Sequence, residues 1–232
     1  MRKKIYIHES DCVAGISNKL IWKFATKIFY TFPNSKIDNE KHILTGQILN
    51  PELFKNINTH EILEENDDLE VLIIAWSQGS TIIFENLIKL LPDIKNVNFT
   101  VILWDKNLHF REKFEKFDNI KTLDFISQGL LKEIYKKTDI AITRGGATTL
   151  WELYFFWIHS IIVPLSSAAW NHQELNANHF VKMFWSDKLD ENNNLKLGLL
   201  NKLTKYANLR KRWLNTTWHN YALERIKKEL EK

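Results

Sequence analysis

The sequence predicts an α/β protein built on parallel β-sheets, and two observations lead to this. Short apolar runs of strand length alternate along the chain with longer stretches whose apolar residues recur at helical spacing. The run at residues 71–75 is continuously apolar, which is typical of a strand buried on both faces of a parallel sheet. A polar and acidic stretch at residues 51–68 interrupts the alternation. We therefore expect two parallel-sheet units joined by a linker.

The elements follow from these patterns in chain order. In the first unit we expect strands over residues 4–7, 27–31 and 42–44, and a helix over 13–24 with Ile16, Leu20 and Phe24 on one face. In the second unit we expect strands over residues 70–75, 99–103, 120–123, 140–143 and 160–163. Helices are expected over residues 81–91, 129–137, 148–156 and 173–184, and the tail at 195–231 reads as helical.

Composition narrows the class of protein. The chain has 232 residues, of which 44% are hydrophobic and 26% charged, as in an ordinary globular protein. The net charge of +4 fits an anionic ligand or membrane surface and gives no indication of nucleic acid. The densest basic segments, Arg210–Arg212 and Arg225–Lys228, are interpreted as a solvated helix face.

Localisation follows from cysteine usage and hydropathy. Cys12 is the single cysteine, so no intramolecular disulfide can form, and the eight histidines are too dispersed to indicate a metal site. The longest apolar run, Leu153–Leu165, is too short to span a bilayer, and no signal peptide opens the chain. We expect a cytoplasmic protein that at most touches a membrane surface.

Two strand–turn–helix junctions carry the functional signal. The segment AWSQGS spans Ala75–Ser80, and the segment TRGGATTLWE spans Thr143–Glu152; each follows a buried strand. Backbone N–H groups at a helix N-terminus bind phosphate, and glycine lets the backbone approach the anion closely. Either turn alone could be a structural loop. Both turns on the carboxyl edge of one sheet favour a nucleotide site.

A third segment, SSAAWNHQELNAN at Ser166–Asn178, is unusually polar for the start of a helix. His172, Gln173 and Asn176 offer several hydrogen-bond donors and acceptors on one face, while the alternative is simple N-capping by Asn171. Neither GxGxxG nor GxxxxGK[ST] occurs, so the sequence indicates no nicotinamide cofactor and no P-loop. No residue is marked as a nucleophile by its local context.

These segments resemble the MurG-type glycosyltransferases. TRGGATTLWEL, IIVPL and AAWNHQELNA resemble the closing half of that family, and AWSQGS resembles its G-G-S-Q-G turn. Upstream, IHESDCVAGISNKL resembles the family's I-H-E-Q-N segment and LTGQILNPEL its T-G-N-P-V-R segment, while DFI at Asp124–Ile126 resembles P-F-I. The blocks occur in the family's order over about the first 180 residues.

The resemblance implies a GT-B fold and an inverting, metal-free and cofactor-free transfer of N-acetylglucosamine from UDP-N-acetylglucosamine to undecaprenyl-pyrophosphoryl-N-acetylmuramyl-pentapeptide, the lipid I to lipid II step of peptidoglycan biosynthesis. The partners it implies are that donor, that lipid-linked acceptor and the inner face of the cell membrane. The domains are then residues 1–50, the remnant of an N-terminal acceptor domain; 51–68, a linker; 69–206, a C-terminal UDP-sugar-binding domain; and 207–232, a C-terminal helix.

The resemblance also assigns roles to residues. Around the diphosphate it places Ser77, Gln78 and Gly79 in the first turn and Arg144, Gly145, Gly146, Ala147, Thr148 and Thr149 in the second. Ile126 would bind uracil through its backbone, and Glu152 would bind the ribose. His172, Gln173 and Asn176 would hold the sugar hydroxyls. Glu9 and Asp11 would lie in the interdomain cleft.

The chain also departs from the family pattern. The glycine-rich G-G-T-G-G-H loop of the first domain has no counterpart here, so we expect roughly a hundred residues of that domain to be missing and assign no catalytic base. Asn50 stands where the family has an arginine, and Asp11 replaces an asparagine. Another GT-B enzyme is therefore one alternative, such as a glycolipid glycosyltransferase or a sugar epimerase. A non-catalytic UDP-sugar-binding subunit that depends on a partner chain is the other.

The tryptophans form the last departure. Nine Trp stand against seven Gly, and Trp76, Trp104, Trp157, Trp170 and Trp185 fall at glycine positions of the family pattern. A bulky side chain at a turn that binds phosphate through its backbone would block the anion. We hypothesise that these codons are UGA, translated as Trp in this sequence but read as Gly in the source organism. The alternative is genuine substitution.

Overall fold

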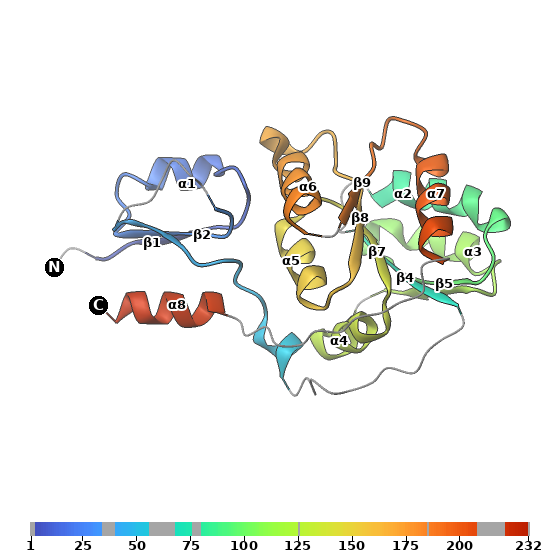
Figure 1. The fold of residues 1–232 in the computed structure, drawn as a ribbon, viewed down its shortest axis with the longest axis horizontal. Helices are drawn as coiled ribbons and strands as arrows, with labels where there is room; N and C mark the ends of the chain where they lie inside the picture. Colours follow the sequence, from blue (N-terminus) through green and yellow to red (C-terminus); the bar gives the residue numbers. More distant parts are fainter. Residues whose placement is uncertain are drawn as a thin grey trace.

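The structure is a computed structural model, and it describes residues 3–33, 40–55, 68–75, 80–124, 126–184, 186–207 and 221–231. It contains two parallel sheets, one of three strands and one of six. The predicted α/β class with two parallel-sheet units is therefore confirmed. Figure 1 shows the small sheet at one end of the molecule and the large sheet with its helices at the other.

The small sheet is formed by the first 44 residues of the chain. Its strands are β1 (Tyr6–Glu9), β2 (Lys27–Tyr30) and β3 (His42–Leu44), in the order β1-β2-β3. Helix α1 (Ile16–Ile21) connects β1 to β2, and helix α8 (Tyr221–Leu230) lies on the other side of the sheet (Figure 1). Lys27 of β2 forms an ion pair with Glu229 of α8 at 2.5 Å, so the C-terminal helix returns to the N-terminal sheet.

The large sheet alternates strands and helices. Its strands are β4 (Leu69–Ile74), β5 (Val97–Ile102), β6 (Ile120–Leu123), β7 (Ile140–Thr143), β8 (His159–Ile162) and β9 (Ser186–Lys188). Its helices are α2 (Ser80–Leu90), α3 (Arg111–Phe114), α4 (Gln128–Lys137), α5 (Ala147–Phe155), α6 (His172–Met183) and α7 (Leu195–Ala207). Short 3-10 helices lie at η1 (Pro51–Phe54), η2 (Leu91–Asp93), η3 (Asp105–Phe110) and η4 (Ala169–Asn171).

The strand order of the large sheet fixes where a ligand can bind. The order is β6-β5-β4-β7-β8-β9, so the chain builds outward from β4 in one direction and then, from β7, in the other. This is the doubly wound order of dinucleotide-binding folds, in which the crevice lies beyond the carboxyl ends of the two central strands. Here those strands are β4 and β7, which pair in parallel.

The core lies on both faces of the large sheet, because alternate residues of β4 point to opposite sides. Val71 and Ile73 pack into one apolar cluster with α2 and α7, and Leu72 and Ile74 into the other with α4. All four are at most 1% exposed. The continuous apolar run that predicted a strand covered on both faces is thus explained by packing.

Most predicted elements agree with the structure to within a residue or two, and the exceptions have physical causes. The first helix is α1, six residues long, and not 13–24, because Glu9 holds the preceding loop in place. Strand β9 and helix α3 were missed because segments of three and four residues are too short to show a hydrophobic period. The predicted tail helix is described as α7 and α8; residues 208–220 and the first predicted turn at 76–79 lie outside the described residues.

The predicted basic helix face is seen only in part. Arg225, Lys227 and Lys228 are exposed on α8, as a solvated face requires, and Arg210–Arg212 lie outside the described residues. No helix in the described part of the chain is long and apolar enough to cross a membrane.

Two of the tryptophans have a backbone conformation that favours glycine. The described non-glycine residues with positive φ are Asn96, Trp157, Trp170, Asn171 and Asn194. Asparagine tolerates the left-handed region, whereas a bulky side chain is strained there. Trp157 has φ of 57° and Trp170 φ of 56°, as the recoding hypothesis expects of glycine positions. Trp104 has extended backbone, and Trp76 and Trp185 lie outside the described residues.

Candidate functional site

The second predicted turn lies where the order of the sheet reverses. Ile74, the last residue of β4, is opposite Thr143, the last residue of β7, and the Thr143 hydroxyl donates to the Ile74 carbonyl at 2.8 Å. The segments that leave the two strands, residues 75–80 and 144–147, therefore start side by side. Ser77, Gln78 and Gly79 of the first segment lie outside the described residues.

The N-terminus of α5 is open towards this edge. Its N-cap is Gly146, and no side chain caps the helix. Its first turn carries no acidic residue, so the partial positive charge of the helix end is not neutralised locally. Thr148, in that first turn, is exposed. Ala147 and Thr149 are buried and fix the turn against the core. The arrangement can bind an anion through backbone N–H groups.

Gly145 is required by a close approach. A Cβ atom at this position would lie 2.3 Å from the backbone oxygen of Gln173, which is far below van der Waals contact. A Cβ at Gly146 would meet nothing within 4 Å. The two glycines of the predicted turn thus differ: the first lets α6 pack against the turn, and the second leaves the helix start uncovered.

Gln173 and Arg144 use their polar groups within the protein. The Gln173 side-chain oxygen accepts hydrogen bonds from the Gly145 and Leu165 N–H groups at 3.1 and 3.0 Å. Arg144 is 4% exposed, and its Nη1 donates to the Val163 carbonyl at 3.0 Å. Arg144 therefore stabilises the turn through contacts within the protein.

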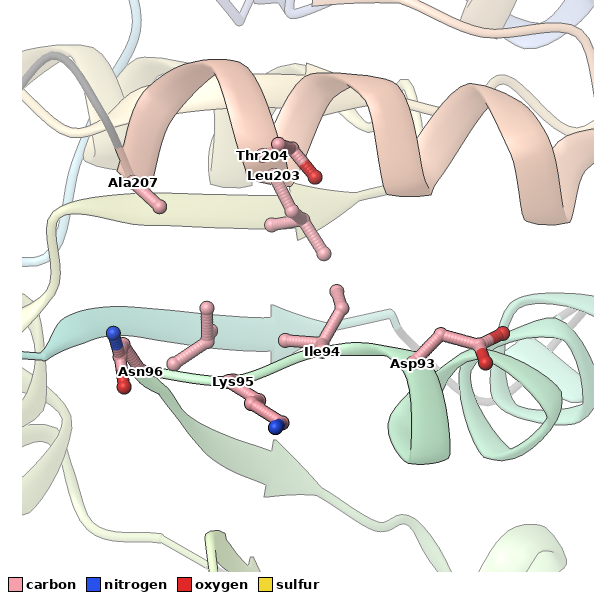
Figure 2. A pocket seen from close by; sticks show the side chains of 8 residues that line it. Asp93, Ile94, Lys95, Asn96, Leu203, Thr204 and Ala207 are labelled. Carbon is pink, nitrogen blue, oxygen red and sulfur yellow. The ribbon is translucent and has the colours of Figure 1, made fainter.

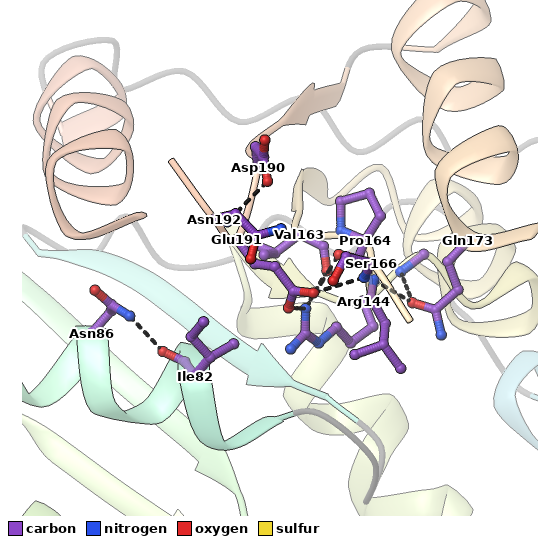
Figure 3. Close-up of polar contacts among 12 residues, drawn as sticks. Ile82, Asn86, Arg144, Val163, Pro164, Ser166, Gln173, Asp190, Glu191 and Asn192 are labelled. Carbon is purple, nitrogen blue, oxygen red and sulfur yellow. Dashed lines mark hydrogen bonds and ion pairs between the residues drawn. The ribbon is translucent and has the colours of Figure 1, made fainter. Parts of the chain in front are cut away.

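The carboxylate that pairs with Arg144 was missed by sequence reasoning. Glu191 lies in the loop between β9 and α7, accepts from Arg144 Nη1 at 2.6 Å and from the Ser166 N–H at 2.7 Å, and its side chain is 7% exposed (Figure 3). Burial opposes ionisation, but the Ser166 and Arg144 contacts hold the pKa of Glu191 below its ordinary value. A single Glu in the polar run DENNN gave no signal, because its importance comes from a partner 47 residues away.

Glu152 lies below the turn, on the second turn of α5. It is 6% exposed and accepts a hydrogen bond from the Tyr135 hydroxyl at 2.9 Å. Burial raises the pKa of Glu152 to about 7, and the Tyr135 hydrogen bond partly opposes this. Ile126 is 8% exposed and packs in the same apolar cluster as Tyr135. The two residues expected at uracil and ribose therefore lie on the same side of the sheet.

Of the two residues expected in the cleft between the domains, Asp11 contacts helix α6 of the large sheet, and Glu9 is hydrogen-bonded within its own loop. Asn176 is fully buried; its Nδ2 donates to Asp11 Oδ1 at 2.7 Å and to the Gly145 carbonyl at 3.0 Å, and its Oδ1 accepts from the Cys12 N–H at 2.9 Å. Glu9 is 4% exposed and accepts from N–H groups of its own loop. Asn176 thus joins the loop after β1 to the turn before α5.

A second contact between the two parts was not predicted. Gln47, which follows β3, donates from Nε2 to the Thr148 hydroxyl at 3.0 Å and accepts from the Thr31 hydroxyl at 2.8 Å. Gln47 is 7% exposed. The start of α5 therefore contacts the segment that follows the small sheet; Gln47 lies within the LTGQILNPEL block, but no role was assigned to it from the sequence.

His172 opens α6 on the exposed side of the site. Its Nδ1 donates to the Ala169 carbonyl at 2.5 Å, and the side chain is half-buried. Asn171 precedes it as the N-cap, in the left-handed conformation, but makes no side-chain capping hydrogen bond. Asn171 is thus the N-cap residue without a side-chain cap, and the Gln173 and Asn176 side chains are instead hydrogen-bonded to the segments that pack on α6.

A separate hollow lies away from this edge. It is lined by Asp93, Ile94, Lys95, Asn96, Val97, Leu203, Thr204 and Ala207, between the segment before β5 and the end of α7 (Figure 2). Because it borders the beginning of β5, it is at the amino edge of the sheet. Parallel α/β sheets bind ligands at the other edge.

Comparisons with known proteins agree with this geometry. Residues 71–231 match the glycosyltransferase family 28 C-terminal domain. The UDP-N-acetylglucosamine–N-acetylmuramyl-(pentapeptide) pyrophosphoryl-undecaprenol N-acetylglucosamine transferase of Thermosipho melanesiensis is 34% identical over 178 residues, covering 77% of this chain and 49% of that protein. The Aquifex aeolicus protein of the same name is 33% identical over 195 residues, covering 78% and 54%. The chain thus spans about half the length of the curated relatives it matches.

Solved structures support the same fold. MurG of Acinetobacter baumannii superposes with a TM-score of 0.70 at 20% identity, covering 99% of this chain and 66% of that one. Staphylococcus aureus MnaA, solved with UDP, superposes with a TM-score of 0.63 at 15% identity, covering 92% and 61%. The GT-B fold expected from the resemblance is confirmed. From its match over residues 71–231, the chain belongs to the glycosyltransferase family 28 C-terminal domain family.

Proposed function

We propose that this chain is the donor-binding part of a MurG-type glycosyltransferase and binds UDP-N-acetylglucosamine at the carboxyl edge of its large sheet. The observation that carries the proposal is the open N-terminus of α5 next to the end of β4, at the reversal point of a doubly wound sheet. The names of the relatives supply the identity of the donor.

Within this proposal the diphosphate binds the N–H groups at the start of α5, from Gly146 to Thr149, and Ser77, Gln78 and Gly79 are assigned to the same diphosphate. Ile126 and Glu152 lie on the nucleoside side. His172, Gln173 and Asn176 lie at the sugar side. Arg144 supports the turn through its hydrogen bond to the Val163 carbonyl, so it acts on the phosphates indirectly.

Gln173 and Asn176 contribute unequally to sugar binding. The Gln173 side-chain oxygen is committed to two backbone N–H groups, so its amide nitrogen is the group that donates to a sugar hydroxyl. Both amide atoms of Asn176 are engaged by Asp11, Cys12 and Gly145. We therefore assign Asn176 to holding the two parts of the chain together below the sugar.

In this proposal the chain contributes to catalysis by stabilising the leaving group, UDP. Transfer breaks the bond from the sugar to UDP, and negative charge develops on the diphosphate. The positive end of the α5 dipole and its N–H groups stabilise that charge without a metal ion, and the sugar contacts orient the anomeric carbon for attack from the opposite face. The acceptor in this proposal is undecaprenyl-pyrophosphoryl-N-acetylmuramyl-pentapeptide, presented at the cytoplasmic surface of the membrane by a second domain.

The domain assignment belongs to the same proposal. Residues 1–50 are part of an acceptor domain, 51–68 the linker, 69–206 the donor domain, and 207–232 the C-terminal segment. Because the chain spans about half the length of the curated relatives, activity requires that the remaining acceptor half be supplied, either by the same polypeptide or by a partner.

Calorimetry of the 232-residue chain with UDP-N-acetylglucosamine, UDP and ADP tests the proposal. We expect UDP and UDP-N-acetylglucosamine to bind at least about tenfold more tightly than ADP. A lack of UDP binding would overturn the proposal. Binding without transfer to a lipid-linked acceptor, restored by adding an acceptor domain, would identify the chain as a partner-dependent subunit.

A further inference from the structure

Glu191 joins two segments that are distant in the sequence. One is the turn before α5, represented by Arg144, and the other is the loop after β8, represented by Ser166. The two oxygens of the Glu191 carboxylate are divided between them: Oε2 accepts from Arg144 Nη1 at 2.6 Å, and Oε1 accepts from the Ser166 N–H at 2.7 Å (Figure 3). Glu191 itself comes from a third element, the loop between β9 and α7.

Gln173 makes a second connection between the same two segments, through the residue after Arg144 and the residue before Ser166. Its Oε1 accepts from the N–H groups of Gly145 and Leu165, at 3.1 and 3.0 Å. Two neighbouring residues of the turn and two neighbouring residues of the loop are therefore tied together by two side chains. Gln173 belongs to α6, so its connection also includes the helix whose start forms the sugar side of the proposed site.

The loop that Glu191 holds leads directly into that helix start. From Ser166 the chain runs through η4, where Trp170 and Asn171 have positive φ, and then enters α6 at His172. The turn on the other side leads into the open N-terminus of α5. The Glu191 carboxylate therefore acts on the spacing between the start of α5 and the start of α6, together with the contacts of Gln173 and Asn176 to Gly145.

The side chains of the Arg144–Glu191 ion pair are buried, so each charge depends on the other as its partner. The side chains are 5% and 7% exposed, so removing the charge of either leaves the other in a poorly solvated place. A buried ion pair contributes little net stability compared with apolar packing, and its best-attested use is to fix one arrangement of the chain. The low pKa of Glu191 keeps it a carboxylate at neutral pH.

We propose that Glu191 is a positioning residue for the sugar of the donor: by holding the Ser166 loop against Arg144, it places His172 and Gln173 at the distance from the α5 N-terminus that a diphosphate-linked N-acetylglucosamine requires. This inference rests on the proposed function. It separates two parts of donor recognition, because UDP alone needs the α5 start, whereas the sugar also needs the loop that Glu191 holds.

The test compares Glu191→Gln with Asp187→Asn. Asp187 is a matched control: it is a hydrogen-bonded carboxylate on β9, with 19% of its side chain exposed, and it accepts from His159 at 3.0 Å and Lys202 at 2.6 Å. His159 opens β8, so this cluster faces the amino edge of the sheet. Both substitutions remove one charge from a polar network, and we expect both to lower the melting temperature.

Calorimetry gives the affinity of each variant for UDP and for UDP-N-acetylglucosamine, and the ratio of these two affinities is compared between the variants. We expect Glu191→Gln to lower the ratio of the sugar-nucleotide affinity to the UDP affinity by about tenfold, with UDP affinity kept within about twofold, and Asp187→Asn to leave the ratio unchanged. Glu191→Asp, which keeps the charge on a shorter side chain, should lower the ratio to an intermediate value and serves if the Gln variant does not fold.

An unchanged ratio in the folded Glu191 variants would overturn this inference while leaving the proposed function intact, because the wild-type chain would still bind UDP. A wild-type chain that binds neither ligand would overturn both. An equal fall in the affinity for both ligands would also contradict the positioning role, since it would place the effect of Glu191 on the diphosphate.

Discussion

Glu152 is an acid kept at an unusual pKa by its surroundings. It is 6% exposed, and burial raises the pKa of its carboxyl from its ordinary value of 4.5 to about 7. A buried carboxyl that is only half ionised near neutral pH costs stability, and such groups concentrate at functional sites. The Tyr135 hydroxyl donates a hydrogen bond to the carboxylate at 2.9 Å.

The first prediction concerns Glu152→Gln and pH. Because the folded-state pKa lies above the unfolded value, the folded chain binds more protons between pH 4.5 and 7, and stability falls as pH rises through that window. Gln removes this loss, which amounts to at most roughly 3 kcal/mol. Urea unfolding at pH 4.5, 6 and 8 should show a flatter profile for the variant. The same fall in both proteins would contradict the assignment.

The second prediction concerns Trp157 and Trp170, the two tryptophans with positive φ. Trp170 is 63% exposed, whereas Trp157 is 40% exposed and its ring lies 6.1 Å from that of Tyr154, so more apolar burial opposes the replacement of Trp157. Trp170→Gly should stabilise the chain by up to about 1 kcal/mol, because glycine relieves the left-handed strain, and Trp157→Gly should stabilise it less. Trp22→Gly is the control: Trp22 packs on Tyr30 and His42, and its loss should destabilise.

The recoding hypothesis is tested by the mass of the protein made in its source organism. Glycine at these positions lowers the intact mass, whereas a mass that accounts for nine Trp would show that the substitutions are genuine. Stabilisation by Trp170→Gly in the recombinant chain would agree with the hypothesis but does not depend on it, since the strain follows from the backbone alone.

At the scale of elements, the start of α5 depends on the distinct tasks of two adjacent glycines. Gly145→Ala places a Cβ 2.3 Å from the backbone oxygen of Gln173, so α6 must move, whereas Gly146→Ala meets open space. We expect Gly145→Ala to cost at least about 2 kcal/mol in stability and to weaken UDP binding, while Gly146→Ala changes stability by less than about 0.5 kcal/mol. Equal effects of the two substitutions on stability would contradict the close packing of α6 on the turn.

The elements themselves show what sequence patterns can predict. β4, β7 and α5 were predictable because apolar period and the glycine turn are local signals, and their bounds agree with the structure within a residue. β9 has the sequence Ser-Asp-Lys, and it forms a strand only because β8 offers an edge for pairing. The contacts of the Glu191 carboxylate and the Gln47 amide could not be predicted from local sequence either, because their partners lie 47 and 101 residues away.

At the scale of the whole molecule, Asn176 is the main polar link between the small and large sheets. It is fully buried and joins Asp11 and Cys12 to Gly145. Asn176→Ala leaves buried donors and acceptors unpaired, so we expect a loss of about 2–4 kcal/mol. Asn178→Ala, at an exposed position of the same helix, should change stability by less than about 0.5 kcal/mol. Similar losses for both would contradict the link.

The site as a whole lies where the two sheets approach each other. The open N-terminus of α5 is bordered by β4 on one side, by α6 on another and by Gln47 from the small sheet on a third. In the proposed function, a donor bound there is held mostly by the large sheet.

A crystal structure of the chain soaked with UDP tests the central claim most directly. The account predicts the diphosphate at the start of α5, within hydrogen-bond distance of the backbone N–H groups between Gly146 and Thr149, with the nucleoside directed towards Ile126 and Glu152. UDP bound elsewhere, for example in the hollow between the segment before β5 and the end of α7, would contradict it.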